Sequence, residues 1–267
     1  MYSSQRTLYG VDLQLAQLLG KNYNPHPGTT LNQLFGVMTT ETIPKGKYPL
    51  LRYFCIGIGG AGMAGDTGNY PYNYHSPLDA GLFDMVPFVL REPSNDISFG
   101  ERRNYRLRAS VRINGISYIG YYLKRVDLDR DIIVSDNFDQ ISRRDNVETF
   151  NEYSLDGKDL LHPTPISKLG KVVSSNSSYV IKSAKFVCRL TTYELDELKK
   201  AIDIIKPDTN ITEIGLVTAH EPDEMEVVCA QIAFHVSVGI DLNMYINTSK
   251  EFYRSFDLGG QEPLFFN

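Results

Sequence analysis

The chain has 267 residues, enough for one large domain or two small ones, and 42% of them are hydrophobic and 22% charged. This composition excludes wholesale disorder, collagen and a simple coiled coil. The net charge of −5 argues against a nucleic-acid coat.

The cysteine count and the apolar runs indicate where the protein is found. Its three cysteines form no CxxC pair, so a disulfide framework is not expected. The N-terminus lacks the pattern of a secretion signal, and no run reaches the roughly 18 apolar residues of a membrane span. We therefore expect a soluble intracellular product with no membrane partner.

The N-terminal segment is predicted to form a helical arm. Apolar residues recur there at spacings of three and four, which places them on one helical face: Leu8, Val11, Leu15, Leu18 and Leu19. Gly20 can cap the helix, and residues 24–28 break the backbone. We predict an arm over residues 1–48 and a β-rich body over 49–267, with Leu8, Val11, Leu15 and Leu18 as candidate interface residues. Because a lone helix is marginal in water, the arm must dock on a neighbouring subunit or on its own core.

A glycine-rich loop follows the first predicted strand, at residues 50–58. Residues 57–62 match G-x-G-x-x-G, but neither a helix nor an acidic second strand follows as dinucleotide binding requires. We therefore expect a flexible loop that binds no nucleotide. Long loops are often binding or assembly elements. Tyr70, Tyr72 and Tyr74 are candidate contacts for a protein partner, although they could equally pack on their own domain.

The strongest local pattern predicts a β-hairpin. Apolar and polar residues alternate over 105–113, and Asn114-Gly115, the preferred pair for a type I′ turn, precedes a second strand over 116–123. Basic residues could line one hairpin face: Arg102, Arg103, Arg106, Arg108, Arg112, Lys124 and Arg125. They would bind phosphate or a partner's carboxylates, or pair with the acidic run 127–131. Arg106, Arg108 and Arg112 are candidate interface residues.

The second half of the chain adds strands and one helix. Strands are expected over 132–135, 179–190, 211–218 and 227–238, whereas 136–164 is polar and weakly periodic. Thr191 and Glu194 form a capping box, and the helix that they begin ends at Pro207. The chain is thus predicted to be α+β and β-rich, with an antiparallel sheet or sandwich body, an N-terminal helix and one helix in the C-terminal half.

Catalytic and metal-binding signatures are incomplete in this sequence. The run 127–131 resembles the start of a calcium loop, but Ile132 and Phe138 stand where glycine and glutamate are needed. His220-Glu221 resembles half of a zinc-binding helix that Pro222 interrupts. The sequence has no G-x-S-x-G motif, and none of its five histidines lies in a nucleophile signature. We therefore predict no catalytic residue, no cofactor and no metal, and a protein that is not an enzyme.

Seven blocks of the sequence carry a family resemblance: 53–60, 76–91, 101–107, 121–126, 211–217, 230–236 and 262–265. Together they resemble virion structural proteins of tailed bacteriophages, and more faintly baseplate wedge proteins of contractile tails. The likeness covers about residues 50–267. The resemblance implies a β-rich subunit that assembles by symmetric contacts, without a cofactor or an active site.

The expected function is therefore structural. We expect a tail or baseplate subunit that is assembled in the host cytoplasm, resides in the virion, and contacts other virion proteins and copies of itself. One alternative is a neck or connector protein whose arginine hairpin faces DNA. Another, from a different class, is a small hydrolase with an unrecognised site.

Overall fold

The computed structural model describes residues 3–37, 42–60, 73, 75–127, 132–134, 138–144, 147–153, 179–237 and 252–263. Contacts within the chain divide it into two units, one of residues 1–127 with 188–253 and one of residues 128–187 with 254–267. This division falls elsewhere than the boundary predicted between residues 48 and 49. The N-terminal helical segment belongs to the first unit.

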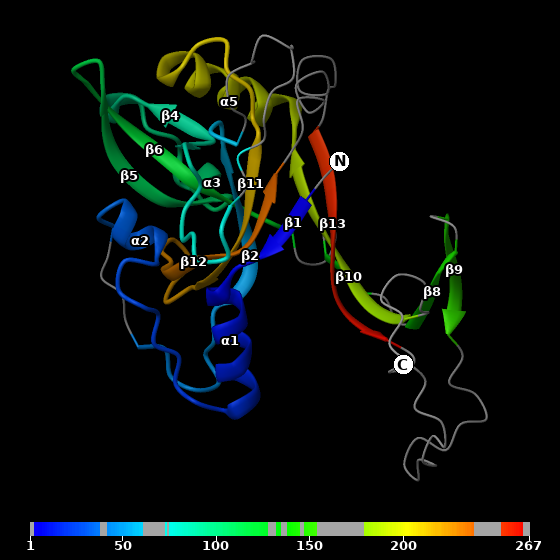
Figure 1. Cartoon of the computed structure of the whole chain (residues 1–267). Coiled ribbons are helices and arrows are strands. Elements are labelled where there is room, and N and C mark those ends of the chain that lie inside the picture. Colours follow the sequence, from blue (N-terminus) through cyan, green and yellow to red (C-terminus); the bar gives the residue numbers. More distant parts are fainter. Residues whose placement is uncertain are drawn as a thin grey trace, which may run out of the picture. The chain divides into compact units, whose positions relative to one another are not determined.

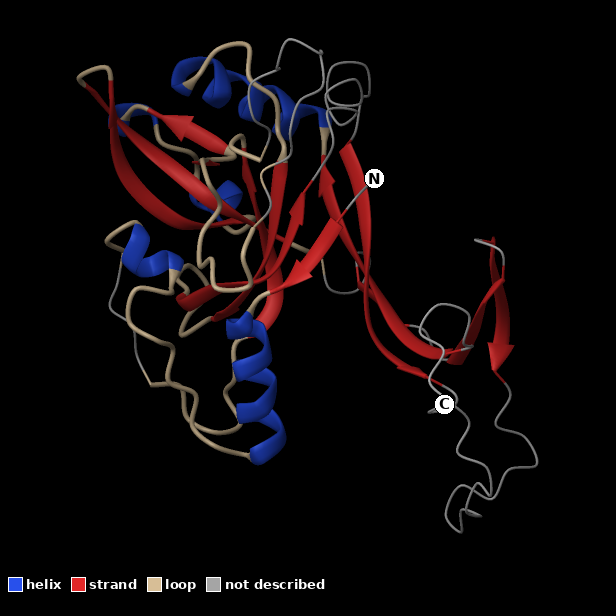
Figure 2. Cartoon of the chain, in the orientation of Figure 1, coloured by secondary structure: helices blue, strands red, loops and turns tan. Residues whose placement is uncertain are grey.

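An antiparallel sheet forms the frame of the first unit (Figures 1 and 2). Within the described residues it has eight strands, in the order β1-β12-β11-β2-β6-β4, with β3 beside β2 and β5 beside β6. Their bounds are Ser3–Arg6 (β1), Leu50–Gly57 (β2), Met85–Val86 (β3), Val89–Arg91 (β4), Tyr105–Ile113 (β5), Ile116–Arg125 (β6), Glu213–His220 (β11) and Val228–Ser237 (β12).

The predicted hairpin is confirmed. Strands β5 and β6 pair antiparallel up to Ile113 and Ile116, which face each other across the turn. Asn114 and Gly115 both have positive φ, at 50° and 85°, as a type I′ turn requires. Alternation in exposure also holds along the outer half of β5, where Arg108, Ser110 and Arg112 are exposed.

The helices of the first unit are mostly short. They are α1 (Leu8–Leu19), α2 (Leu31–Leu34), α3 (Phe99–Arg102) and α5 (Thr192–Ile205), and a 3-10 turn, η1, covers Pro93–Asn95. The predicted capping box is present at α5, where Thr191 and Glu194 exchange hydrogen bonds. Helix α5 packs on β4 through a buried apolar face, which includes Leu195, Leu198 and Ala201.

Helix α1 docks on strand β12 of its own chain. Thr7 caps the helix, and its backbone N–H and hydroxyl donate to the carbonyls of Ala233 (2.9 Å) and Ile232 (2.6 Å). Gly10 lies so close to β12 that an added Cβ would be 3.0 Å from the Ala233 carbonyl oxygen. Leu13 is the buried leucine of this face. The helix is therefore held by a small residue and a cap as much as by apolar burial.

A core cluster joins α2 to the sheet. Leu31 packs with buried side chains of β2, β5, β6, β11 and β12, among them Tyr53, Leu107, Leu123 and Val217. Asn32 is also buried and bonds the backbone of β12, accepting from the Ala230 N–H (2.9 Å). These contacts fix one end of β5 and the start of β12, which border the pocket described below.

The second unit is a smaller sheet. Its described strands are β7 (Ile132–Val134), β8 (Phe138–Arg144), β9 (Val147–Tyr153), β10 (Tyr179–Leu190) and β13 (Phe252–Pro263). Their order is β13-β10-β8-β9, with β7 beside β10. Strands β7 and β10 confirm two predicted strands. Strands β8, β9 and β13, and also β1, have no counterpart in the prediction.

The fold class is therefore as predicted, α+β and β-rich, with an antiparallel sheet, an N-terminal helix and a helix in the C-terminal half.

Candidate functional site

The leucine face predicted on α1 is the exposed face of the helix. Leu8 and Leu15 are half exposed, and Leu18 is 82% exposed. Leu19 at the end of the helix is exposed as well, whereas Val11 is only partly buried. The apolar stripe thus points away from β12, because Gly10 and Leu13 occupy the other side of the helix. Helix α1 therefore docks on β12 of its own chain through Gly10 and Leu13, and its leucine face remains exposed.

The candidate tyrosines cannot be placed in the fold. Tyr70, Tyr72 and Tyr74 lie outside the described residues, as do positions 61–69 of the glycine loop. Their role in a protein contact stays a prediction.

The basic residues of the hairpin are engaged by carboxylates and carbonyls of the first unit. Arg108 Nη2 lies 2.9 Å from an Asp96 oxygen, and Lys124 pairs with Glu194. Arg125 pairs with Glu221 at 3.4 Å. Arg112 Nε donates to the Gly115 carbonyl (3.1 Å), which closes the turn. Pairing within the chain, one of the two roles considered for these basic residues, is therefore present. The carboxylates are Asp96, Glu194 and Glu221 rather than those of the acidic run 127–131. Residues 128–131 of that run lie outside the described residues.

Arg106 differs from the exposed row in which the alternation placed it. Arg106 is only 1% exposed. Its Nη1 donates to the carbonyls of Arg102 (3.1 Å), Arg103 (3.0 Å) and Tyr105 (2.8 Å). Its Nη2 donates to the Glu224 carbonyl. The next residue, Leu107, has a φ of +56°, which interrupts regular β geometry at this point. Three consecutive residues of β5 are consequently buried.

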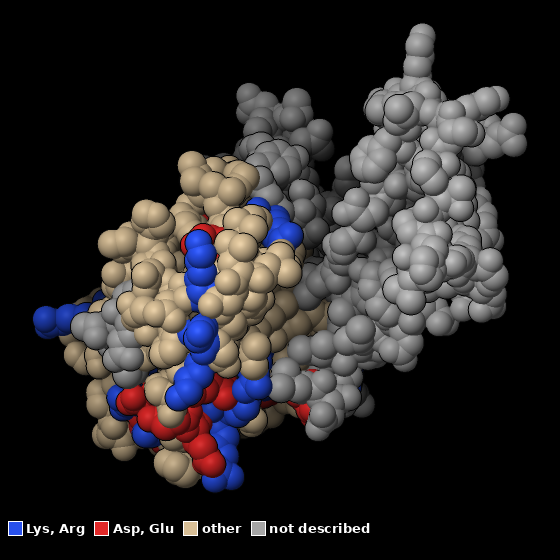
Figure 3. Space-filling view, turned by 90° about the horizontal axis from the view of Figure 1, so that it is seen from below, with Lys and Arg blue, Asp and Glu red and all other residues tan. Residues whose placement is uncertain are grey.

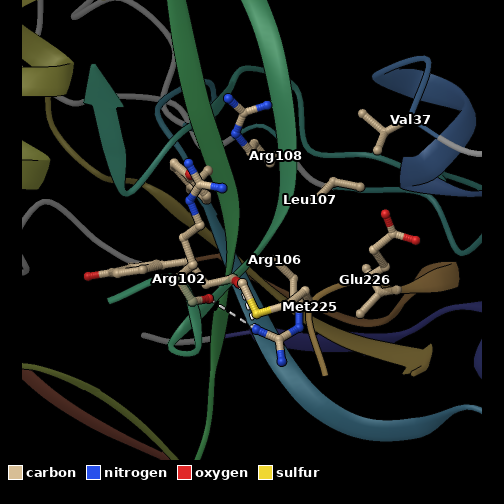
Figure 4. Close-up of a pocket in the computed structure, with 10 residues that line it drawn as sticks. Val37, Arg102, Arg106, Leu107, Arg108, Met225 and Glu226 are labelled. Carbon is tan, nitrogen blue, oxygen red and sulfur yellow. Dashed lines mark hydrogen bonds between the residues drawn. The ribbon is translucent and has the colours of Figure 1, made fainter. Parts of the chain in front are cut away.

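A pocket of about 240 Å³ opens beside this part of β5. Figure 4 shows its arginines, which come from the end of α3 and from β5, together with side chains from the segment before β12. The lining includes Arg102, Arg106, Arg108, Leu107, Met225 and Glu226. It therefore combines guanidinium groups with apolar surface, a combination suited to an anion carried on an apolar body.

Asp96 organises two of the pocket arginines. Its Oδ2 lies 2.6 Å from Arg102 Nη2 and 2.9 Å from Arg108 Nη2, and its Oδ1 accepts from the Tyr121 hydroxyl (2.8 Å). Burial opposes ionisation, but hydrogen bonds from Tyr121 and Arg108 outweigh it and hold the pKa of Asp96 below its ordinary value. Burial, and next the bond to Asp96, raise the pKa of Tyr121 to about 12. Tyr121 is thus a stable donor to an ionised Asp96.

A second cluster, the Glu213 cluster, lies in the first unit around the buried Glu213, at the start of β11. Glu213 is fully buried, and its Oε2 lies 2.8 Å from His75 Nε2. The other ring nitrogen of His75 lies 3.1 Å from Asp79 Oδ2. His75 therefore lies between two carboxylates, and each of its ring nitrogens has one of them as its neighbour.

His235 completes the Glu213 cluster. Its ring stacks on that of His75, with centroids 3.9 Å apart, and its Nε2 lies 3.0 Å from the Asp79 carbonyl oxygen. Burial is the main reason why the pKa of His235 is lowered, and the nearby His75 adds to the effect. His235 is thus a buried residue of β12, within the strand predicted over 227–238, and its ring stacks on that of His75.

Gly57 and Gly59 of the G-x-G-x-x-G segment lie against Glu213. Glu213 accepts from the backbone N–H groups of Gly59 (2.9 Å), Phe83 (3.1 Å) and Asp84 (3.3 Å). A Cβ added at Gly57 would lie 2.5 Å from Glu213 Oε1. These amides, together with His75, lower the pKa of Glu213 against the opposing effect of burial. Part of the segment expected to be a free loop is therefore bound to a carboxylate of the same chain.

Sequence reasoning missed the carboxylates that organise both clusters. The spacing of four residues between His75 and Asp79 is a weak local signal of a contact. Nothing in the sequence near Glu213 or Asp96 indicates these partners. Glu213 binds His75 and backbone amides of residues 59, 83 and 84, and Asp96 binds side chains of α3, β5 and β6.

Three further observations concern other classes of site. On the face shown in Figure 3, basic and acidic side chains lie beside one another among uncharged ones. Within the described ranges, no group of three or more histidine, cysteine, aspartate or glutamate residues could hold a metal ion. In the same part of the chain, no helix is long and apolar enough to cross a membrane.

Comparison with known families places the chain in one of them. A family model, described as a family of unknown function (DUF7208), matches residues 2–267. The chain therefore belongs to this family. Neither a curated protein nor a solved structure matches the chain.

Proposed function

We propose that this DUF7208 member is a non-enzymatic structural component of a tailed-phage particle, an assembly subunit of its tail or baseplate. The observation that carries the proposal is the exposed leucine face of α1, formed by Leu8, Leu15, Leu18 and Leu19. Single exposed leucines are common on monomers, but four on one helical face form a contiguous apolar surface of the kind that marks a protein contact.

The way in which α1 is held makes this surface suitable for assembly. Thr7, Gly10 and Leu13 fix the helix on β12, so its outer face is preformed and needs no folding on binding. A preformed surface loses little conformational entropy on association. The resemblance of blocks within residues 50–267 to virion structural proteins supports the same role.

The histidine cluster supports a structural role over a catalytic one. The side chain of His75 is 2% exposed, and both of its ring nitrogens face carboxylates of the same chain. A general base must reach the proton that it abstracts from a bound substrate. Here the imidazole of His75 links the 75–84 segment to Glu213 of β11, which stabilises the fold.

The charge pattern favours the tail or baseplate over a neck protein that faces DNA. Lys124, Arg108 and Arg125 each pair with a carboxylate of the first unit. Binding to the DNA backbone depends on basic side chains that are free to neutralise phosphates. Strong, salt-sensitive binding of the purified chain to bare DNA would favour the neck alternative instead.

Electron microscopy of the phage that encodes this chain tests the proposal. Gold-labelled antibodies against the purified chain should decorate the tail or baseplate of intact particles. A chain with Leu15→Asp and Leu18→Asp should fold but fail to enter particles, because a carboxylate buried without a partner disfavours the contact. Gln14→Asp, on an exposed position of the same helix, is the matched control. Unlabelled particles, or normal incorporation of the double variant, would contradict the proposal.

A further inference from the structure

The pocket beside β5 holds more positive than negative charge. Three guanidinium groups border it, those of Arg102, Arg106 and Arg108, and the carboxylates beside them are those of Asp96 and Glu226. Arg103, outside the lining, has its own partner in Glu224 (3.6 Å). One positive charge of the pocket therefore has no counter-charge among its described neighbours.

Arg106 is the residue whose charge lacks a carboxylate. It is almost completely buried, its described partners are backbone carbonyls, and its Nε has no hydrogen-bond partner in the described part of the chain. The Nε of Arg102 is also buried without a hydrogen-bond partner in the described part of the chain. A buried cation is costly unless an anion or several dipoles compensate it. Carbonyl dipoles do this for Arg106 in part, and an anion in the pocket would complete the compensation.

The backbone next to Arg106 is held in an unfavourable conformation. Leu107 lines the pocket with a φ of +56°, a region that a leucine rarely adopts. Such residues persist only where the surrounding structure holds them, and they cluster at ligand sites. Leu107 also directs its side chain into the core cluster of the sheet. Packing in the core thus holds Leu107 in this conformation at the border of the pocket.

We propose that this pocket binds a carboxylate on an acidic side chain of a neighbouring subunit in the particle. The proposal rests on the assembly role above and names the chemistry of the partner. A single carboxylate matches the one surplus positive charge, and the apolar lining, which includes Val37 and Met225, accommodates the carbon chain that carries it. A polyanion such as DNA fits less well, because Asp96 and the exposed Glu226 would repel its successive phosphates.

Binding of short peptides to the full chain tests this inference. The probe is acetyl-Glu-Leu-amide, with acetyl-Gln-Leu-amide as the uncharged match, measured by calorimetry or by NMR titration. We expect the glutamate peptide to bind at least about tenfold more tightly, since hydrogen bonds to charged groups are the stronger ones.

Three exposed residues supply variants of opposite sign. Arg108→Gln lowers the positive charge of the pocket by one, which cancels its excess over the carboxylates, and should weaken binding of the glutamate peptide about tenfold. Glu226→Gln removes a repelling carboxylate and should strengthen binding several-fold. Arg112→Gln, on the same strand but outside the pocket, should leave binding unchanged. Circular dichroism of each variant checks that the fold is intact.

Other outcomes would overturn the inference. Equal binding of both peptides, no binding at millimolar concentration, or an equal loss in Arg108→Gln and Arg112→Gln would each refute a carboxylate site. If inorganic phosphate or a duplex oligonucleotide bound more tightly than the peptide, and Arg108→Gln abolished that binding, the site would be one for phosphate. Peptide binding does not depend on α1, so the Leu15→Asp and Leu18→Asp chain should bind normally. A failed pocket is thereby distinguished from a failed assembly role.

Discussion

Replacing Glu213 tests whether the Glu213 cluster holds the 75–84 segment and the glycine segment on the sheet. Glu213→Leu would leave His75 and the backbone amides of Gly59, Phe83 and Asp84 without their acceptor. An unpaired buried donor costs about 1–3 kcal/mol, and a broken buried ion pair about 3–5 kcal/mol. The hydrogen bonds from the three backbone amides to Glu213 are only partly buried, so water can replace some of them when the carboxylate is removed. We expect a loss of about 3–5 kcal/mol in the free energy of unfolding.

Equilibrium urea unfolding followed by circular dichroism measures this loss. Glu213→Gln keeps an oxygen that can accept from the amides but loses the charge opposite His75, so it should cost roughly half as much. Glu92→Gln, at an exposed glutamate, is the control and should stay within about 0.5 kcal/mol of the parent chain. A loss below about 1 kcal/mol in Glu213→Leu would show that the cluster is not a fastening of the fold.

Four more changes follow from the structure. Gly115→Val should cost about 1 kcal/mol or more by thermal unfolding, because Gly115 has a φ of 85°; unchanged stability would refute the turn assignment. Gly59→Ala should cost about 1–3 kcal/mol, since the new Cβ would lie 2.7 Å from a side-chain atom, whereas Gly100→Ala meets nothing within 4 Å and should be nearly neutral. Thr191→Ala should cost about 1 kcal/mol in urea unfolding by removing the α5 cap. The pKa of His235 is lowered in the folded chain, so as the pH falls the unfolded chain protonates this histidine before the folded chain does. The free energy of unfolding should therefore fall below a pH of about 6.5, and fall less steeply in His235→Gln; the same pH dependence in both chains would contradict the assignment.

Elements governed by local chemistry were predictable from the sequence. The hairpin at Asn114-Gly115 and the cap at Thr191 depend on residues close together in the chain, and both are present. The helix α1 was also predictable, but not its orientation. The leucine spacing identifies an apolar face correctly, yet the buried face is decided by Gly10 and its close approach to Ala233, a contact between distant parts of the chain.

The strands of the second unit show a different limit. Strand β8 reads FDQISRR and β9 reads VETFNEY, so polar residues outnumber apolar ones in both. Hydrophobic periodicity is the main signal for a strand, and it is weak in such segments. Their pairing with each other is the feature that defines them, and pairing cannot be derived from composition. The same reason hides Asp96 and Glu213, whose partners come from other elements.

The connectivity of the large sheet constrains how a newly made chain folds. Ser3 pairs with Ser237, and β2 pairs with β11, so strands from both ends of the first unit meet in one sheet. Most of the chain, including the whole segment 128–187 of the second unit, must leave the ribosome before these pairs can form. Sheets with such distant pairings fold slowly and expose unpaired strand edges meanwhile. We therefore expect nascent copies to need protection by chaperones, and expression at lower temperature to raise the yield of soluble subunit.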